Sequence, residues 1–264
     1  MVPRKIKKLE QLPKLPNGKY DMKKLLSVVT ATAVALALLT GAVAVPTLVR
    51  PIYYAHITPL GLPEKSGMTQ EEIIDAYDEV INYCTGVTDE FSAGILPFSA
   101  EGADHFKDCR RLLLLDYWLF AASMAVLAAV IVYARKHKLH RFLNRGPAFW
   151  GATGLSATLL IIGTAAATNF EKAFTLFHTL FFPGKDNWVL YSNVDPVIRI
   201  MPEEFFRNCA IVILGVIVVV TIVIAAMVSK ERSKQRGFSL LARSTKIRAL
   251  YSSISSNGVS RRYF

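Results

Sequence analysis

Four stretches of this sequence are apolar, almost uncharged and long enough to cross a lipid bilayer. They cover residues 25–49, 112–133, 147–170 and 208–229. A membrane-spanning helix needs about 20 such residues, and a hydrophobic content of 52% exceeds what a soluble core usually requires. The third stretch is rich in glycine and alanine, which allows close packing between helices. We therefore predict an all-α membrane protein whose four transmembrane helices form a single domain over residues 25–229.

The first of these stretches is preceded by eight basic residues, a pattern that it shares with secretory signal peptides. A signal peptide has an apolar region of only about 7–15 residues, and this stretch is longer. We expect a retained membrane span, with a cleaved signal as the alternative.

The basic residues indicate how the helices are oriented. Of the 31 lysines and arginines, 22 lie in residues 1–24, 134–146 and 230–264, and loops rich in these residues stay in the cytoplasm. Both termini are therefore predicted to be cytoplasmic, as a basic arm (1–24) and a disordered basic tail (230–264). The net charge of +11 then reports topology, so we expect contact with bilayer phospholipid and none with nucleic acid.

The same rule makes residues 50–111 and 171–207 extracytoplasmic. In the first of these segments, Thr69 and Glu72 have the spacing of a capping box, and apolar residues follow at helical intervals. We expect an amphipathic helix here, with packing as its role.

A second helical pattern runs from residue 99 into the second apolar stretch. In a continuous helix His105 shares a face with four residues, because steps of three, four, seven and eleven positions return near the same side; these are Asp108, Cys109, Leu112 and Asp116. An ionisable residue inside a span is a candidate functional group. Asp116 is only one turn inside the apolar stretch, so a side chain that simply reaches the interface explains it equally well.

Residues 174–187, FTLFHTLFFPGKDN, place His178 among phenylalanines and end in a Pro-Gly turn. About ten apolar residues are too few to cross the bilayer again. The segment is therefore predicted to be interfacial or re-entrant, or to extend the third span as a straight helix. Taken alone, a histidine in this setting is usually a hydrogen-bonded packing residue.

Two motifs resemble the signature regions of the Lit family of lipoprotein intramolecular transacylases. One is ADHFKDCRRLL, which contains His105. The other is FHTLFF-PG-x-x-x-W, which contains His178 and Trp188 and is followed by NVDPVIRIMPEEFF, with Asp195. The resemblance covers residues 25–229, and it implies that His105 and His178 are the catalytic pair.

The resemblance also implies a reaction, in which the sn-2 acyl chain of a diacylglyceryl-modified N-terminal cysteine moves to the amino group of that cysteine. The product is a lyso-form lipoprotein, and lipoprotein N-termini are the expected partners. The chemistry asks for a base, an acid and hydrogen-bond donors for an oxyanion, and for no cofactor or metal. Histidines suit the proton transfers, and Asp108 or Asp195 can orient them; Asp116 and Trp188 complete the candidate site.

Several alternative roles fit the same residues. Cys84 and Cys109 can form a disulfide, and Cys109 can act as an acyl carrier with histidine as its base. A small transporter would use Asp116 as a buried relay, although the sequence has no internal repeat. A noncatalytic scaffold or sensor would bind its partner through the acidic region 64–101. A metal held by the two histidines and a carboxylate matches no local metal-binding spacing, and no feature indicates an oligomeric state.

Overall fold

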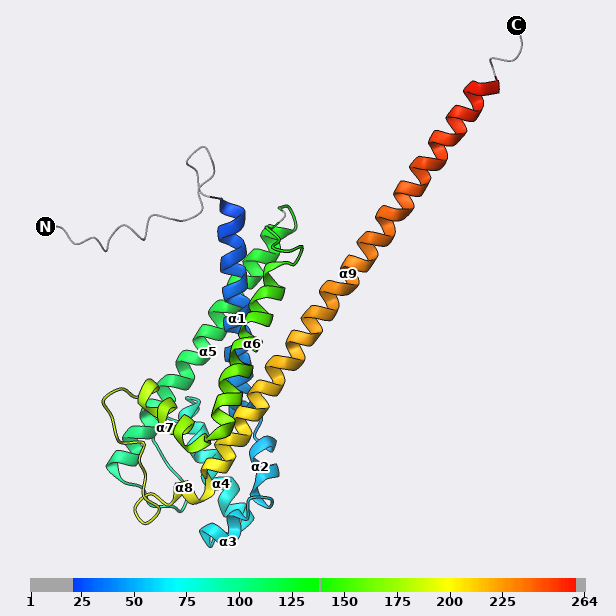
Figure 1. The fold of residues 1–264 in the computed structure, drawn as a ribbon. Coiled ribbons are helices and arrows are strands. Elements are labelled where there is room, and N and C mark those ends of the chain that lie inside the picture. Colours follow the sequence, from blue (N-terminus) through cyan, green and yellow to red (C-terminus); the bar gives the residue numbers. More distant parts are fainter. Residues whose placement is uncertain (1–20, 138, 260–264) are drawn as a thin grey trace, which may run out of the picture. The chain divides into compact units, whose positions relative to one another are not determined.

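The computed structural model describes residues 21–137 and 139–259, and for most residues after 230 it describes the backbone alone. Within these ranges every regular element is a helix, apart from an isolated bridge between Phe142 and Arg145 (Figure 1). The all-α prediction is confirmed. The contacts divide the chain after Thr221 into two units.

Among the described residues, four helices are long and apolar enough to span a membrane: α1 (Met22–Leu48), α5 (Ala100–Ala134), α6 (Pro147–Thr168) and the Glu203–Lys230 part of α9 (Glu203–Val259). This confirms a multi-pass membrane protein with four spans. The orientation of the termini stays a prediction.

Two of these helices extend beyond the predicted spans. α5 begins at Ala100 rather than near residue 112, so the continuous helix expected from residue 99 onward is confirmed. α9 continues to Val259, where we expected a disordered tail. Residues 230–259 contain no proline, so no proline ring breaks the helix in that stretch. The predicted basic arm falls almost entirely on residues 1–20, which lie outside the described residues, as do residues 260–264.

Small residues bring the spans close together. α1 packs against both α5 and α6, and a Cβ atom on Gly151 of α6 would overlap the carbonyl oxygen of Ala31 in α1. In the same helix, the hydroxyl of Ser156 lies 2.7 Å from that of Thr221 in α9. The packing role expected for the small residues of the third span is thereby confirmed.

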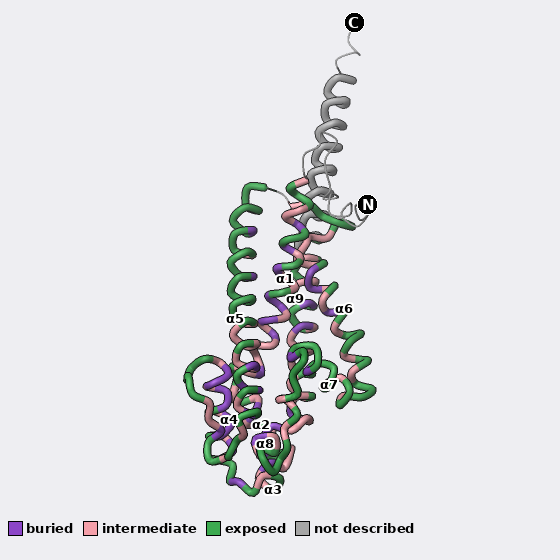
Figure 2. Tube along the Cα trace, turned by 90° about the vertical axis from the view of Figure 1, so that its left-hand side faces the viewer, coloured by how far each residue is buried: buried purple, intermediate pink, exposed green. Residues whose placement is uncertain are grey.

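The outward faces of the spans carry exposed apolar side chains, as lipid-facing helices do. Trp118 of α5 is 74% exposed and Ile161 of α6 is 72% exposed. Exposed positions follow one another along the upper part of α5 in Figure 2.

Four short helices form a cap at one end of the spans: α2 (Pro51–Ile57), α3 (Leu62–Ser66), α4 (Gln70–Cys84) and α8 (Val197–Ile200). The rings of Tyr53 and Tyr77 stack with centroids 3.5 Å apart at the centre of this cap, and the Tyr53 hydroxyl donates to the Ile200 carbonyl over 2.8 Å. The predicted capping box is present, since Thr69 and Glu72 bond reciprocally at the start of α4. The segment between the first two spans is therefore helical, as expected.

The predicted interfacial segment is a separate helix, α7 (Phe170–Phe181). Asn169 interrupts the chain between α6 and α7 with an extended backbone (φ −158°, ψ 92°), and its side chain caps α7 by accepting from the Lys172 amide over 2.9 Å. A straight extension of α6 is thereby excluded. Whether α7 is interfacial or re-entrant stays a prediction.

Candidate active site

The start of α5 fixes the register of His105. Ser99 caps the helix by accepting from the Gly102 amide, and Asp195 in turn accepts from both the amide and the hydroxyl of Ser99 over 2.8 Å. A Cβ atom on Gly102 would overlap an Asp195 oxygen, so the contact requires glycine. Asp195 is thus placed on the N-terminus of α5, where it anchors the loop before α8, and the structure does not bring it onto either histidine.

His178 is held in a defined tautomer by α7. Its Nδ1 lies 2.7 Å from the carbonyl oxygen of Phe174, one turn earlier. A carbonyl only accepts, so Nδ1 carries the proton and Nε2 is the basic nitrogen. Burial lowers the pKa of His178 below its usual value, and the bond to Phe174 opposes this only in part.

The two histidine rings lie close together, tilted by 37°, although they come from helices far apart in the sequence. Their ring centroids are 5.9 Å apart, and each side chain is only 7% exposed. The buried ring of Phe182 contacts both, with centroids 5.2 Å from His105 and 5.7 Å from His178. The structure therefore brings together the pair to which the family motifs point.

The Trp188 indole covers one face of the His178 imidazole. The indole stacks on the imidazole with centroids 4.7 Å apart, and its Nε1 donates to the Lys185 carbonyl over 3.1 Å. The loop after α7 thus turns back and covers the histidine that α7 carries.

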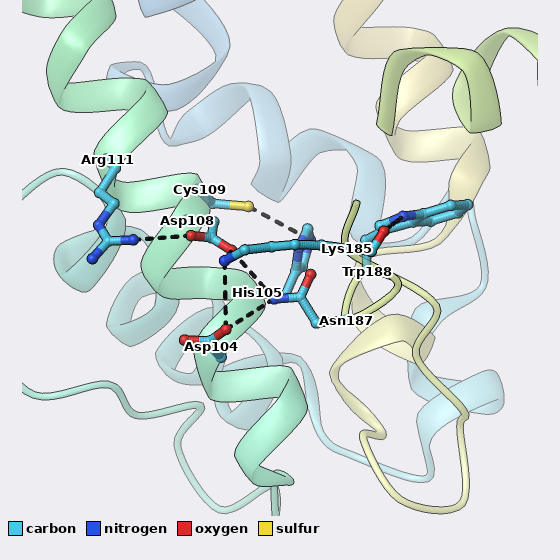
Figure 3. Close-up of polar contacts among 8 residues, drawn as sticks. All are labelled: Asp104, His105, Asp108, Cys109, Arg111, Lys185, Asn187 and Trp188. Carbon is cyan, nitrogen blue, oxygen red and sulfur yellow. Dashed lines mark hydrogen bonds and ion pairs between the residues drawn. The ribbon is translucent and has the colours of Figure 1, made fainter. Parts of the chain in front are cut away.

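An ionic cluster lies beside His105 and joins α5 to this loop (Figure 3). The Lys185 ammonium donates to Asp108 and lies 3.6 Å from Asp104, and the Asn187 amide donates to both carboxylates over 3.2 Å. Arg111 also donates to Asp108, over 3.2 Å. The bond to Asp108 raises the pKa of Lys185 above its usual value. Asp108 is therefore engaged by this cluster.

The cysteines are free thiols, and the disulfide considered between Cys84 and Cys109 is not formed. The two thiols have different partners: that of Cys84 faces the Phe106 carbonyl at 4.0 Å, and that of Cys109 lies 3.5 Å from Nε2 of His105.

Asp116 is a half-buried residue of α5, and one of its oxygens is buried without a hydrogen-bond partner. It lies eleven residues beyond His105, which corresponds to about 16 Å along a helix. The structure therefore does not bring Asp116 to the histidine pair.

Two other buried polar atoms without a partner belong to the site, namely Nδ1 of His105 and the Asn187 side-chain oxygen. A pocket of about 360 Å³ lies on the other side of Phe182, the ring that contacts both histidines. Its lining combines apolar and charged residues: Asp108, Arg111, Leu112, Leu115, Phe181, Phe182, Pro183 and Lys185. Such a lining suits an amphiphile with an apolar chain and a polar head. Among the described residues, no group of three histidine, cysteine or acidic side chains is placed to hold a metal ion.

Sequence reasoning missed three residues of the site. Phe182 had a usable signal, because it follows His178 by four positions within the FHTLFF motif. Lys185 and Asn187 had none, since they lie in an irregular loop and their partners are some 80 positions earlier in the chain.

Comparisons with known proteins bear on this geometry. The sequence profile of the family "Lipoprotein intramolecular transacylase Lit" matches residues 28–206, which include both histidines. The chain belongs to the Lit family. No curated protein sequence matches it.

Solved structures of a Lit family member have the same fold. The membrane integral lipoprotein intramolecular transacylase Lit from Bacillus cereus is similar with a TM-score of 0.70 and 27% identity, covering 80% of this chain and 98% of that one. Two further structures of that protein, in which one histidine is replaced by arginine or by alanine, match with TM-scores of 0.69 and 0.70, again at 27% identity. Each covers 81% of this chain, and 94% and 96% of its own.

Proposed function

We propose that this protein is a lipoprotein intramolecular transacylase that uses His105 and His178 for acid–base catalysis. Its substrate is a lipoprotein whose N-terminal cysteine carries a diacylglyceryl group, and its product is the lyso-form with the acyl chain on the amino group. One observation carries the proposal: in a chain of the Lit family, two buried imidazoles lie with centroids 5.9 Å apart, and Phe182, which contacts both, also lines an amphiphilic pocket.

The reaction balances without a protein nucleophile or water. The neutral amine attacks the sn-2 ester carbonyl, a C–N bond forms, and the nitrogen loses one proton. The tetrahedral intermediate then collapses, the bond to the sn-2 oxygen breaks, and that oxygen gains one proton. The enzyme has to move this proton, stabilise the oxyanion and hold amine and ester together; orientation alone can reach effective molarities of about 10⁵ M.

The contacts of the two rings support different roles. His178 presents a basic Nε2, because Nδ1 donates to the Phe174 carbonyl, and so it removes the proton from the amine. His105 has a buried, unpartnered Nδ1, which suits a hydrogen bond to the oxyanion, and the protonated Nε2 of His178 then returns the proton to the departing oxygen. In this scheme Asp108 holds the loop that carries Lys185 and Asn187, and Asp195 holds the N-terminus of α5. Trp188 shields His178.

The membrane setting is part of the proposal. The basic flanks predict that the cap and the site lie on the extracytoplasmic side. The substrate's acyl chains stay in the bilayer while its ester and amine reach the site from the lipid phase. Leu115 and Phe181, two apolar residues of the pocket lining, are exposed at the surface, which suits that approach.

The test is transacylation of a synthetic diacylglyceryl-cysteine peptide by the protein in lipid nanodiscs. The mass does not change in an intramolecular transfer, so the readout is loss of the free amine together with tandem mass spectrometry of the N-terminal fragment. His178→Gln and His105→Gln should each lower the rate about 10²- to 10⁴-fold, the range of general acid–base catalysis.

His56→Gln is the matched control, because Nδ1 of His56 also contacts a carbonyl one turn earlier, at 2.6 Å, but outside the site. It should keep full activity. Unaltered peptide with the wild-type protein would refute the transacylase proposal, and full activity in both histidine variants would refute the catalytic pair.

The acyl-carrier alternative for Cys109 is tested by the same assay. Cys109→Ser should retain activity, because the substrate's own amine is the nucleophile. A mixture of two peptides with isotopically distinct acyl chains should show no exchange between them. Loss of activity in the serine variant with trapped acyl-protein would instead favour the carrier.

A further inference from the structure

Lys185 contacts residues next to both histidines, although sequence reasoning gave it no role. Its ammonium bonds to Asp108 and lies 3.6 Å from Asp104, and these two residues flank His105 in α5. Its carbonyl oxygen accepts from the Trp188 indole, which stacks on His178. Lys185 thus connects the α5 carboxylates beside His105 with the loop that carries Trp188 (Figure 3).

We propose that Lys185 is a positioning residue, which sets the separation of His105 and His178 by tying the Trp188 loop to α5. The inference rests on the proposed function for its effect on activity. Its effect on the position of Trp188 can be measured without any substrate.

The tie is needed because the pair has no direct link. Across residues 21–137 and 139–259, no hydrogen bond joins the two imidazoles, and α6 and α7 are separated by the break at Asn169. Phe182 supplies packing between the rings, but packing leaves them free to slide. The ionic contact adds direction, and the Asn187 amide adds a second tie to the same two carboxylates.

Because Asp108 is buried, its carboxylate depends on partners such as the Lys185 ammonium. Asp108 is 8% exposed, so its carboxylate requires charged or hydrogen-bonding partners. The Lys185 side chain is 39% exposed and keeps part of its hydration. Removing the ammonium leaves Asp108 with Arg111 and Asn187, so the protein should still fold, while the loop is held to α5 only by the neutral Asn187 amide and becomes less firmly placed.

The first measurement uses the fluorescence of Trp188. The chain has three tryptophans, and replacing Trp118 and Trp150 by phenylalanine leaves only the one that stacks on His178. A protonated imidazole quenches a stacked indole, so emission should fall as the pH is lowered. His178→Gln should abolish this step, and His105→Gln shows what the other facing imidazole contributes.

In this background, Lys185→Met should lose most of the quenching, because the indole leaves the imidazole, and Lys185→Arg should retain it. Lys172→Met is the matched control: Lys172 is the other lysine between the third and fourth spans, and it lies on α7 away from the cluster. Asp108→Asn should reproduce the effect of Lys185→Met, and the double variant should be no worse than either alone.

The second measurement is transacylation. A displacement of about 1 Å at a reacting group costs on the order of 10²-fold, so Lys185→Met should lower kcat by up to that factor with little change in KM. Lys185→Arg should restore most of it. Unchanged quenching and unchanged kcat in Lys185→Met would each overturn the inference. If the wild type proves inactive, the proposed function fails, and the fluorescence still decides whether Lys185 positions Trp188.

Discussion

His178 combines a fixed tautomer with a dry environment, and the two features have separate causes. The bond from Nδ1 to the Phe174 carbonyl decides which nitrogen is basic. Burial disfavours the imidazolium and lowers the pKa. The neutral, basic form therefore persists as the pH falls to about 6.5, the value at which an ordinary histidine is half protonated.

Phe182→Ala tests whether burial lowers the pKa of His178. Removing the ring that covers both imidazoles admits water, so the pKa of His178 should rise toward about 6.5. Protonation then begins at higher pH, and the acid limb of kcat should move up with it. The measurement is histidine NMR of the labelled protein, with the His178 signal assigned from the His178→Gln spectrum. A pKa that stays low after this substitution would show that burial by Phe182 is not its cause.

At the residue scale, the sequence predicts a residue's role where a motif or a nearby partner marks it. It does not predict contacts with partners far along the chain. His105 and His178 carry recognisable motifs. The tautomer of His178 depends on a carbonyl four residues away, which any helix supplies. Asp108 was expected to orient a histidine, yet it is engaged by Lys185, Asn187 and Arg111. Two of these partners come from a loop about 80 positions later, and no local pattern reports such a contact.

At the scale of the helices, local signals predicted the starts well. The capping box at Thr69 marked the start of α4, and the helical pattern from residue 99 marked the start of α5. The break between α6 and α7 could not be predicted, because a single asparagine with an extended backbone produces it. The early start of α5 is marked by Ser99, but the support from Asp195 is again a long-range contact.

The close approach of α1 and α6 gives a prediction for stability. Gly151→Ala places a methyl group against the Ala31 carbonyl, so the helices must move apart, at a cost of about 1–3 kcal/mol. Gly154→Ala is the matched control in the same helix, because a Cβ there meets nothing within 4 Å. Unfolding in mixed micelles should show a loss for Gly151→Ala alone, and equal stability of the two variants would contradict the packing described.

For the whole molecule, apolar length and composition were enough to predict four spans, and charge placement was enough to propose their orientation. Cysteine accessibility tests that orientation. In a background with Cys84 and Cys209 replaced by alanine and Cys109 by serine, Val87→Cys should react with an impermeant thiol reagent in intact cells, because Val87 is 70% exposed in the cap region. Lys136→Cys, in the basic loop after α5, should react only after the membrane is opened. The reverse pattern would place the site in the cytoplasm.

Replacing Asp116 distinguishes the proposed transacylase from a small transporter. Its carboxylate lies too far along α5 to serve the histidine pair, so Asp116→Asn should leave the transacylation rate within about 2-fold, as expected for sites that act independently. A proton-flux assay in liposomes gives the complementary test. Loss of a proton current in this variant, with no transacylation by the wild type, would favour the carrier.

The length of α5 has a consequence for the membrane in which the protein works. Its 35 residues extend about 52 Å, against about 30 Å of hydrocarbon, and His105 lies about 10 Å before the apolar stretch that begins at Leu112. In the proposed reaction, the helix therefore sets the depth at which the ester must reach His105, near the level of the lipid headgroups. Bilayers made thicker or thinner with longer or shorter acyl chains should slow the reaction by moving the ester past this level, so membrane thickness becomes a determinant of turnover.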